Sequence, residues 1–211
     1  MTCCTYDQND TVPLDSLLRH VAVMLPDVPY EVALDLLRQR YTELCRKSGV
    51  LVYPFELPIQ RGVPNYFLIP PDGHEVYKVV GVGDPFPTMF VGPSPNRWFA
   101  YWGYQFRVIG NTQIVFAQAP SRDETGRYII LGLIPNDCVS DIPTSIATPF
   151  GKAIAEGAIA DILLMPGKAW TNPGLANRYE RGYNIAVMAA RNMAITERGA
   201  KPAEFKPVRI L

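Results

Sequence analysis

One segment near the end of the chain, residues 149–199, constrains the fold more than any other. Its first arm, residues 150–164, is rich in Ala, Ile and Leu, and it ends before Pro166, because proline cannot continue a helix. Asn172 and Pro173 give the second arm a strong start, since Asn accepts hydrogen bonds from free N–H groups and Pro suits the first helical position. The segment therefore predicts a hairpin of two long, packed helices.

Two shorter helices are predicted before residue 50. The first begins near Pro13 and ends at Pro26, because leucine and valine recur in this stretch at spacings of three and four. The second has Asp27 as its candidate N-cap, Pro29 near its start and Gly49 as its end. Residues before the first helix are polar, and we expect them to form an arm.

The character of the sequence changes between residues 50 and 142. Short apolar and aromatic runs alternate there with turns rich in proline and glycine, as is typical of an antiparallel sandwich or small barrel. The predicted strands cover residues 50–57, 66–69, 76–82, 98–101, 105–108, 114–117 and 128–134.

Together these patterns predict an α+β fold, in which a helical bundle is interrupted by an antiparallel β insertion. The expected organisation is an N-terminal arm and two helices over residues 1–49, the β insertion over 50–142, the helical hairpin over 143–199 and an extended C-terminal arm over 200–211.

The C-terminal arm combines apolar and basic side chains, and its two prolines exclude a continuous helix. Because exposing such a segment to water is costly, we expect it either to fold back on its own domain or to dock on a partner. The residues expected to dock are Lys201, Phe205, Lys206, Val208, Arg209, Ile210 and Leu211.

The whole chain is balanced, with 20 basic and 20 acidic residues, so no global field favours nucleic acid or an acidic partner. A local basic excess nevertheless begins at residue 172. It indicates either an ordinary solvated helix face or contact with an acidic neighbour or passing DNA. The basic residues are Arg178, Arg181, Arg191, Arg198, Lys201, Lys206 and Arg209.

An aromatic run occupies residues 98–104, with arginines nearby on both sides. Aromatic side chains dominate protein cores and interfaces, and we expect this run to serve as both. The alternative is a β-module binding protein that stacks glycans or single-stranded nucleic acid on these rings. The residues expected to contact a partner protein or such a ligand are Trp98, Tyr101 and Trp102.

No catalytic or metal-binding constellation is recognisable in the sequence. His20 and His74 have no cysteine, histidine or carboxylate at metal-ligand spacing, and the four cysteines lack a C-x-x-C pair. The glycines before Asp84 lack the third glycine and the context of a dinucleotide-binding loop. We therefore expect no metal, no cofactor and no enzymatic activity. A site assembled from scattered residues such as His74 and Asp84 is the enzymatic alternative.

The termini and hydropathy bear on location. The first residues are polar rather than a signal peptide, and no apolar stretch of about 20 residues could span a membrane. We expect a soluble protein that is made in a cytoplasm.

The hairpin also carries a family resemblance. Residues 152–160, KAIAEGAIA, and residues 165–173, MPGKAWTNP, resemble the hairpin motif of head-to-tail adaptors of short-tailed bacteriophages, the tail tubular protein A-like connectors. Ala169 stands where that motif has proline. The expected order of helices, β insertion, long hairpin and arm resembles the same family.

The resemblance implies a structural virion protein at the head–tail junction. Such adaptors form a ring, usually twelvefold, that joins the capsid portal protein to the tail nozzle or tube and lets double-stranded DNA pass. It implies that the arm docks on the portal or on a neighbouring subunit, and that the β module meets the next tail component. Small residues permit close helix packing within or between subunits, and we expect a contact between subunits for Ala153, Gly157, Ala158 and Ala160.

Overall fold

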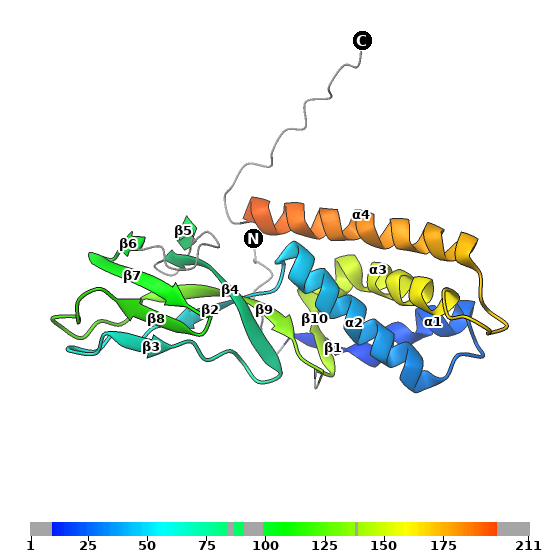
Figure 1. Cartoon of the computed structure of the whole chain (residues 1–211), viewed down its shortest axis with the longest axis horizontal. Helices are drawn as coiled ribbons and strands as arrows, with labels where there is room; N and C mark the ends of the chain where they lie inside the picture. Colours follow the sequence, from blue (N-terminus) through cyan, green and yellow to red (C-terminus); the bar gives the residue numbers. More distant parts are fainter. Residues whose placement is uncertain (1–9, 84–86, 91–98, 138, 198–211) are drawn as a thin grey trace, which may run out of the picture.

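The computed structural model describes residues 10–83, 87–90, 99–137 and 139–197. Helices gather at one end of an elongated molecule and β-strands at the other (Figure 1). The helices are the 3-10 turn η1 (Leu14–Leu17), α1 (Leu18–Met24), α2 (Tyr30–Ser48), α3 (Thr144–Leu163) and α4 (Pro173–Glu197). The strands are β1 (Thr11–Pro13), β2 (Val52–Glu56), β3 (Asn65–Phe67), β4 (His74–Gly83), β5 (Pro87–Phe90), β6 (Phe99–Tyr101), β7 (Tyr104–Ile109), β8 (Gln113–Phe116), β9 (Tyr128–Pro135) and β10 (Asp141–Pro143).

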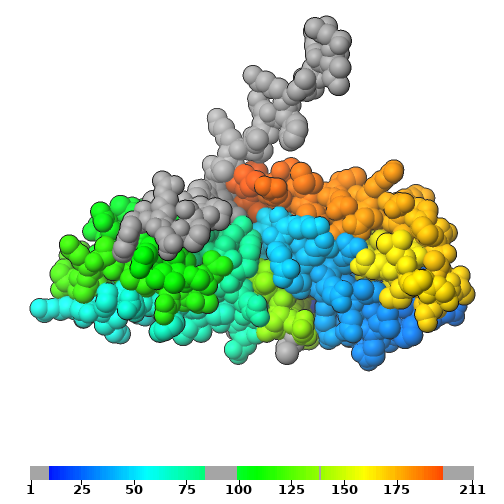
Figure 2. Space-filling model, in the orientation of Figure 1, coloured from blue at the N-terminus to red at the C-terminus, as the bar shows by residue number. Residues whose placement is uncertain are grey.

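Helix α3 is the centre of the helical end. Its sequence is apolar on nearly every side, and a helix of that kind is stable only when neighbours cover it all round. The helices α1, α2 and α4 all pack against it, and α1 and α4 lie on opposite sides of it (Figure 1). Figure 2 shows α4, in orange, along one edge of this end, and α1 with the start of α2, in blue, along the other.

The β end contains two four-stranded antiparallel sheets, with strand orders β2-β9-β4-β5 and β3-β8-β7-β6. Strand β9 is central in the first sheet and is buried along almost its whole length. Apolar side chains of both sheets and of the helices belong to one continuous buried cluster. The α+β fold with antiparallel sheets inserted between helix pairs is thus confirmed.

A two-stranded ribbon links the start of the chain to the helical hairpin. Strand β1 pairs antiparallel with β10, from Thr11↔Pro143 to Pro13↔Asp141. The expected polar arm is therefore wrong for residues 11 and 12, which belong to β1. The ribbon leads directly into η1 on one side and α3 on the other.

Several predicted element boundaries are wrong. Helix α3 begins at Thr144 rather than at residue 150, so Pro149 lies inside its second turn. Ile146 is fully buried, and its packing outweighs the single intrahelical hydrogen bond that Pro149 cannot donate. Asp27 does not cap α2: the N-cap is Pro29, without a side-chain hydrogen bond.

Other predicted boundaries are confirmed. Gly49 ends α2 in the left-handed conformation, at φ 68°. Asn172 caps α4, because its Oδ1 accepts a hydrogen bond from Leu175 N at 3.0 Å. Within the described ranges, no helix is both long enough and apolar enough to cross a bilayer.

Candidate functional site

Arg40 on α2 joins three helices through its guanidinium group. Its Nε and Nη2 donate to the two carboxylate oxygens of Asp161 on α3, at 2.6 and 2.5 Å. Its Nη1 donates to Glu43 at 2.9 Å, and its Nη2 lies 2.9 Å from Glu180 on α4. We call Arg40, Glu43, Asp161 and Glu180 the Arg40 cluster. Only 11% of the Arg40 side chain is exposed, so water weakens these charged hydrogen bonds little, and they hold the three helices together.

The electrostatics keep the Arg40 cluster charged. Burial disfavours the charged guanidinium, but hydrogen bonding to Asp161 and the surrounding carboxylates outweigh it and raise the pKa of Arg40. Burial likewise acts against the charged form of Glu43. The hydrogen bond from Lys47 and the charge of Arg40 outweigh it and lower the pKa of Glu43. Both groups therefore stay ionised at neutral pH, which indicates a structural rather than a proton-transfer role.

Tyr183 on α4 completes the contact from a fully buried position. Its hydroxyl donates to the backbone carbonyl of Arg40 at 2.8 Å, and the Arg40 guanidinium lies 4.9 Å from the ring centroid. Gly157 on α3 faces this ring, and a Cβ at that position would lie 2.9 Å from Tyr183 Cδ2. The close approach of α3 and α4 thus depends on glycine.

The small residues singled out on α3 pack within the chain. Ala158 and Ala160 are fully buried, and Gly157 lies against Tyr183. Of the two alternatives for these positions, the structure assigns these three to packing inside the subunit. Ala153 is half-buried, and of the four it alone is left for a contact between subunits.

The outer face of α4 combines apolar and basic side chains. Ile185 and Met188 are 71% and 53% exposed, on the side opposite the buried stripe that includes Tyr183 and Val187. Exposed arginines flank them along the helix, and the ion pairs of the described residues include none of these arginines. We call this face the α4 ridge; it consists of Arg178, Arg181, Ile185, Met188 and Arg191.

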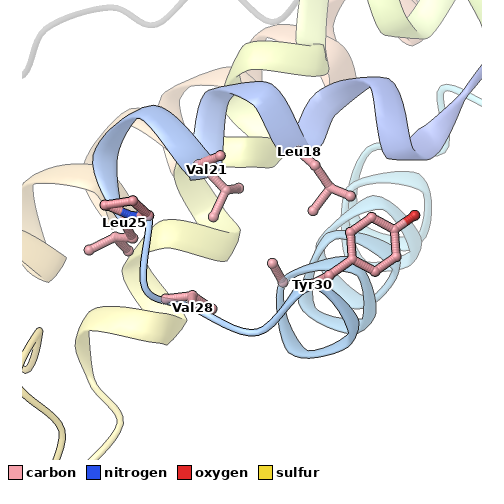
Figure 3. A pocket seen from close by; sticks show the side chains of 8 residues that line it. Leu18, Val21, Leu25, Val28 and Tyr30 are labelled. Carbon is pink, nitrogen blue, oxygen red and sulfur yellow. The ribbon is translucent and has the colours of Figure 1, made fainter.

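The opposite edge of the helical end carries an apolar hollow between α1 and α2. Its volume is about 140 Å³. Leu18 and Val21 project from α1 into this space, above the connection that carries Val28 (Figure 3). We call it the corner hollow; its lining residues are Leu18, Val21, Ala22, Leu25, Pro26, Val28, Tyr30 and Ala33.

The aromatic run forms one end of the β module. Tyr101 ends β6, and Trp102 and Gly103 make the turn to β7 with positive φ angles of 56° and 79°. The Trp102 ring stacks on Phe106 with centroids 6.3 Å apart, and the Arg127 guanidinium lies 5.9 Å from its centre. Tyr101 and Trp102 are therefore brought together, half-buried against their own module.

The residues considered for chemistry lie apart. His74 is buried at the start of β4, where burial lowers its pKa and its Nδ1 lies 3.0 Å from the carbonyl oxygen of Asp72. Burial raises the pKa of the Cys45 thiol. Among the described residues, no group of three His, Cys, Asp or Glu side chains could hold a metal ion. Asp84, the suggested partner of His74, lies outside the described residues.

Other predicted site residues also lie outside the described ranges. They are Trp98, Arg198 and the whole docking set of the C-terminal arm, Lys201, Phe205, Lys206, Val208, Arg209, Ile210 and Leu211.

No protein-family model and no curated protein sequence matches the chain.

Sequence reasoning missed the Arg40 cluster, although one signal was present. Arg40 follows Leu37 and precedes Tyr41 and Leu44 on the stripe of α2 that is buried. An arginine in that position is almost never buried without a charged partner, so a carboxylate on another helix was to be expected. The arginines of the α4 ridge belong to the basic excess seen in the sequence. The exposure of Ile185 and Met188 and the corner hollow had no signal, because a sequence does not show which face of a helix its neighbours leave open.

Proposed function

We propose that this chain is a head-to-tail adaptor of a tailed bacteriophage, a structural virion protein without enzymatic activity. In this role, copies form a ring beneath the capsid portal, join it to the tail nozzle or tube, and let double-stranded DNA pass. The ring is expected to contain twelve copies, as the family resemblance implies.

The observation that carries the proposal is how the motif residues build the α3–α4 turn. The Thr171 hydroxyl donates to the Met165 carbonyl at 2.5 Å, and Asn172 N donates to the Leu163 carbonyl at 2.9 Å. Gly167 supplies the positive φ of 71° that the turn requires. The residues that resemble the adaptor motif thus form the turn between α3 and α4. This structural role supports the view that the resemblance did not arise by chance.

The architecture also supports the proposal. The Arg40 cluster makes the three long helices a stiff unit, as a ring that transmits force between head and tail requires. The β module lies at the far end of the molecule, where it can reach a different partner (Figure 1). In our proposal the helical ends form the ring, the C-terminal arm docks on the portal and the β module contacts the next tail component.

The proposal is tested in the virus that encodes the chain. Deleting its gene should leave capsids that have portals but lack tails, and supplying the protein from a plasmid should restore tailed particles. Electron microscopy of purified particles gives the readout. Normal tails on particles from the deletion virus would contradict the proposal.

A further inference from the structure

The two edges of the helical end are complementary to each other. The α4 ridge presents Ile185 and Met188 with Arg178 and Arg181 before them and Arg191 after them. Residues 178, 181, 185 and 188 recur at spacings of three and four, so they share one helix face. The ridge spans about 20 Å from its first to its last arginine, at ~1.5 Å per residue.

The corner hollow offers an apolar socket with an acidic rim. Ala22, exposed on α1, and Tyr30, 54% exposed on α2, both line it. Asp27 and Glu31 are exposed at the same corner, and the ion pairs of the described residues include neither of them.

The other charged residues near the corner hollow leave the net charge of its rim negative. Asp35, one turn further along α2, is already paired with Arg38 at 3.1 Å. Arg19 is an exposed cation on α1. Asp27 and Glu31 therefore remain as the available anions of the rim, against this single arginine.

The volume of the corner hollow and the charges at its rim indicate which surface can occupy it. A hollow of about 140 Å³ is close to cavities of ~150 Å³ that accept a benzene ring, so it can receive the side chain of Met188 or Ile185. The α4 ridge cannot pair with its own copy, because arginines would face arginines. The corner cannot pair with its own copy either, because its acidic rim would face itself.

We propose that the α4 ridge of one copy inserts into the corner hollow of the next copy. The two surfaces lie on opposite sides of α3 (Figure 1). Each copy can therefore present its α4 ridge to one neighbour and its corner hollow to the other. Such a head-to-tail contact generates a ring when its rotation closes. This inference rests on the proposed adaptor function, for which it names the contact between subunits.

Charge reversal tests the pairing. Arg181→Glu or Glu31→Arg alone should weaken the contact between neighbouring copies about tenfold, because each places like charges face to face. The two substitutions combined in one chain should restore the contact. Arg46→Glu, at an exposed position in the last turn of α2 that belongs to neither surface, is the matched control and should have no effect. Native mass spectrometry of the protein with the portal ring of the same virus measures the copies bound per ring.

Cysteine trapping tests the direction of the contact. Two singly substituted chains, Ala22→Cys in the hollow and Met188→Cys on the ridge, are mixed under mild oxidation, with Cys3, Cys4 and Cys138 replaced by serine. We expect the mixed disulfide dimer and neither of the two same-variant dimers.

The outcomes separate the two proposals. If the wild type binds the portal ring but charge reversal has no effect and the mixed disulfide does not form, the subunit contact is wrong and the adaptor function stands. If the wild type does not bind the ring, the adaptor function fails. The trapping experiment on the free chain at high concentration then decides the contact, which the mixed disulfide supports and its absence overturns.

Discussion

Arg40 shows how one residue can organise a helical domain. It is surrounded by Asp161, Glu180 and Glu43, which come from three helices and compensate the cost of burying its charge. Its carbonyl oxygen also receives the Tyr183 hydroxyl, so both its side chain and its backbone contribute to the contact with α4.

Replacing Arg40 with Met should destabilise the fold by about 2–3 kcal/mol, because Asp161 and Glu180 would lose their cation while Glu43 would keep only Lys47. The cost stays below that of a fully buried pair since the carboxylates are partly exposed. Urea unfolding followed by circular dichroism measures the change. Arg38→Met, which removes the surface pair with Asp35, is the control and should cost less than about 1 kcal/mol. Equal costs for both variants would contradict the structural role of Arg40.

His74 should make stability depend on pH. Its burial lowers its pKa in the folded state, whereas in the unfolded chain it titrates near 6.5. Below about pH 6.5 the unfolded state therefore binds more protons than the folded state, and the free energy of unfolding should fall as the pH drops from 7 through this range.

Unfolding measurements between pH 7.5 and 5.5 test the role of His74. His74→Gln should lose this part of the pH slope, whatever its effect on absolute stability, whereas the control His20→Gln should retain it. An unchanged slope in His74→Gln would assign the pH dependence to other groups.

At the scale of elements, the contact between α3 and α4 sets the helical hairpin. Both helices were predictable, because apolar periodicity, the Pro166–Gly167 break and the Asn172 cap are local signals. The position of Arg40 on the buried stripe of α2 indicates a carboxylate partner, but the identity of that partner was not predictable, because Asp161 lies 121 positions away.

Errors at element ends have the same origin. Pro149 is a local signal for a helix boundary, but burial of Ile146 overrides it. Strand β1 has only three residues, and its partner β10 is distant in sequence. No local sequence pattern therefore predicts the two-stranded ribbon. The surfaces of the candidate site depend on which faces packing leaves open, which only the assembled helices reveal.

Gly157→Ala should reverse the usual preference of helices for alanine. Alanine in a helix normally gains up to about 1 kcal/mol over glycine, but here the new Cβ would lie 2.9 Å from Tyr183 Cδ2 and 3.1 Å from Arg40 Cδ. We expect a net loss of about 1–3 kcal/mol in thermal or urea unfolding. Gly174→Ala is the control, since its nearest neighbour would be at 3.6 Å, and it should be neutral or stabilising. A gain at both positions would contradict the tight α3–α4 contact.

The whole molecule has two ends with different surfaces. The helical end carries the α4 ridge and the corner hollow, and the β end carries the half-buried Tyr101 and Trp102 (Figures 1 and 2). This polarity is what an adaptor between two unlike partners needs.

Deleting residues 201–211 should abolish attachment to the portal while leaving the fold intact. The deletion removes the apolar and basic docking set but none of the described helices and strands. Circular dichroism checks the fold, and sedimentation with the portal ring checks attachment. Substituting Lys201, Lys206 and Arg209 with Gln should give a partial loss if charge contributes. Undiminished attachment of the truncated chain would contradict portal docking by the arm.

The most direct test of the adaptor function is the native mass of the portal ring of the same virus, measured with and without this protein. We predict a fixed increase in mass that corresponds to one copy of the protein for each portal subunit. A portal ring whose mass does not change when the protein is in excess would contradict the adaptor function.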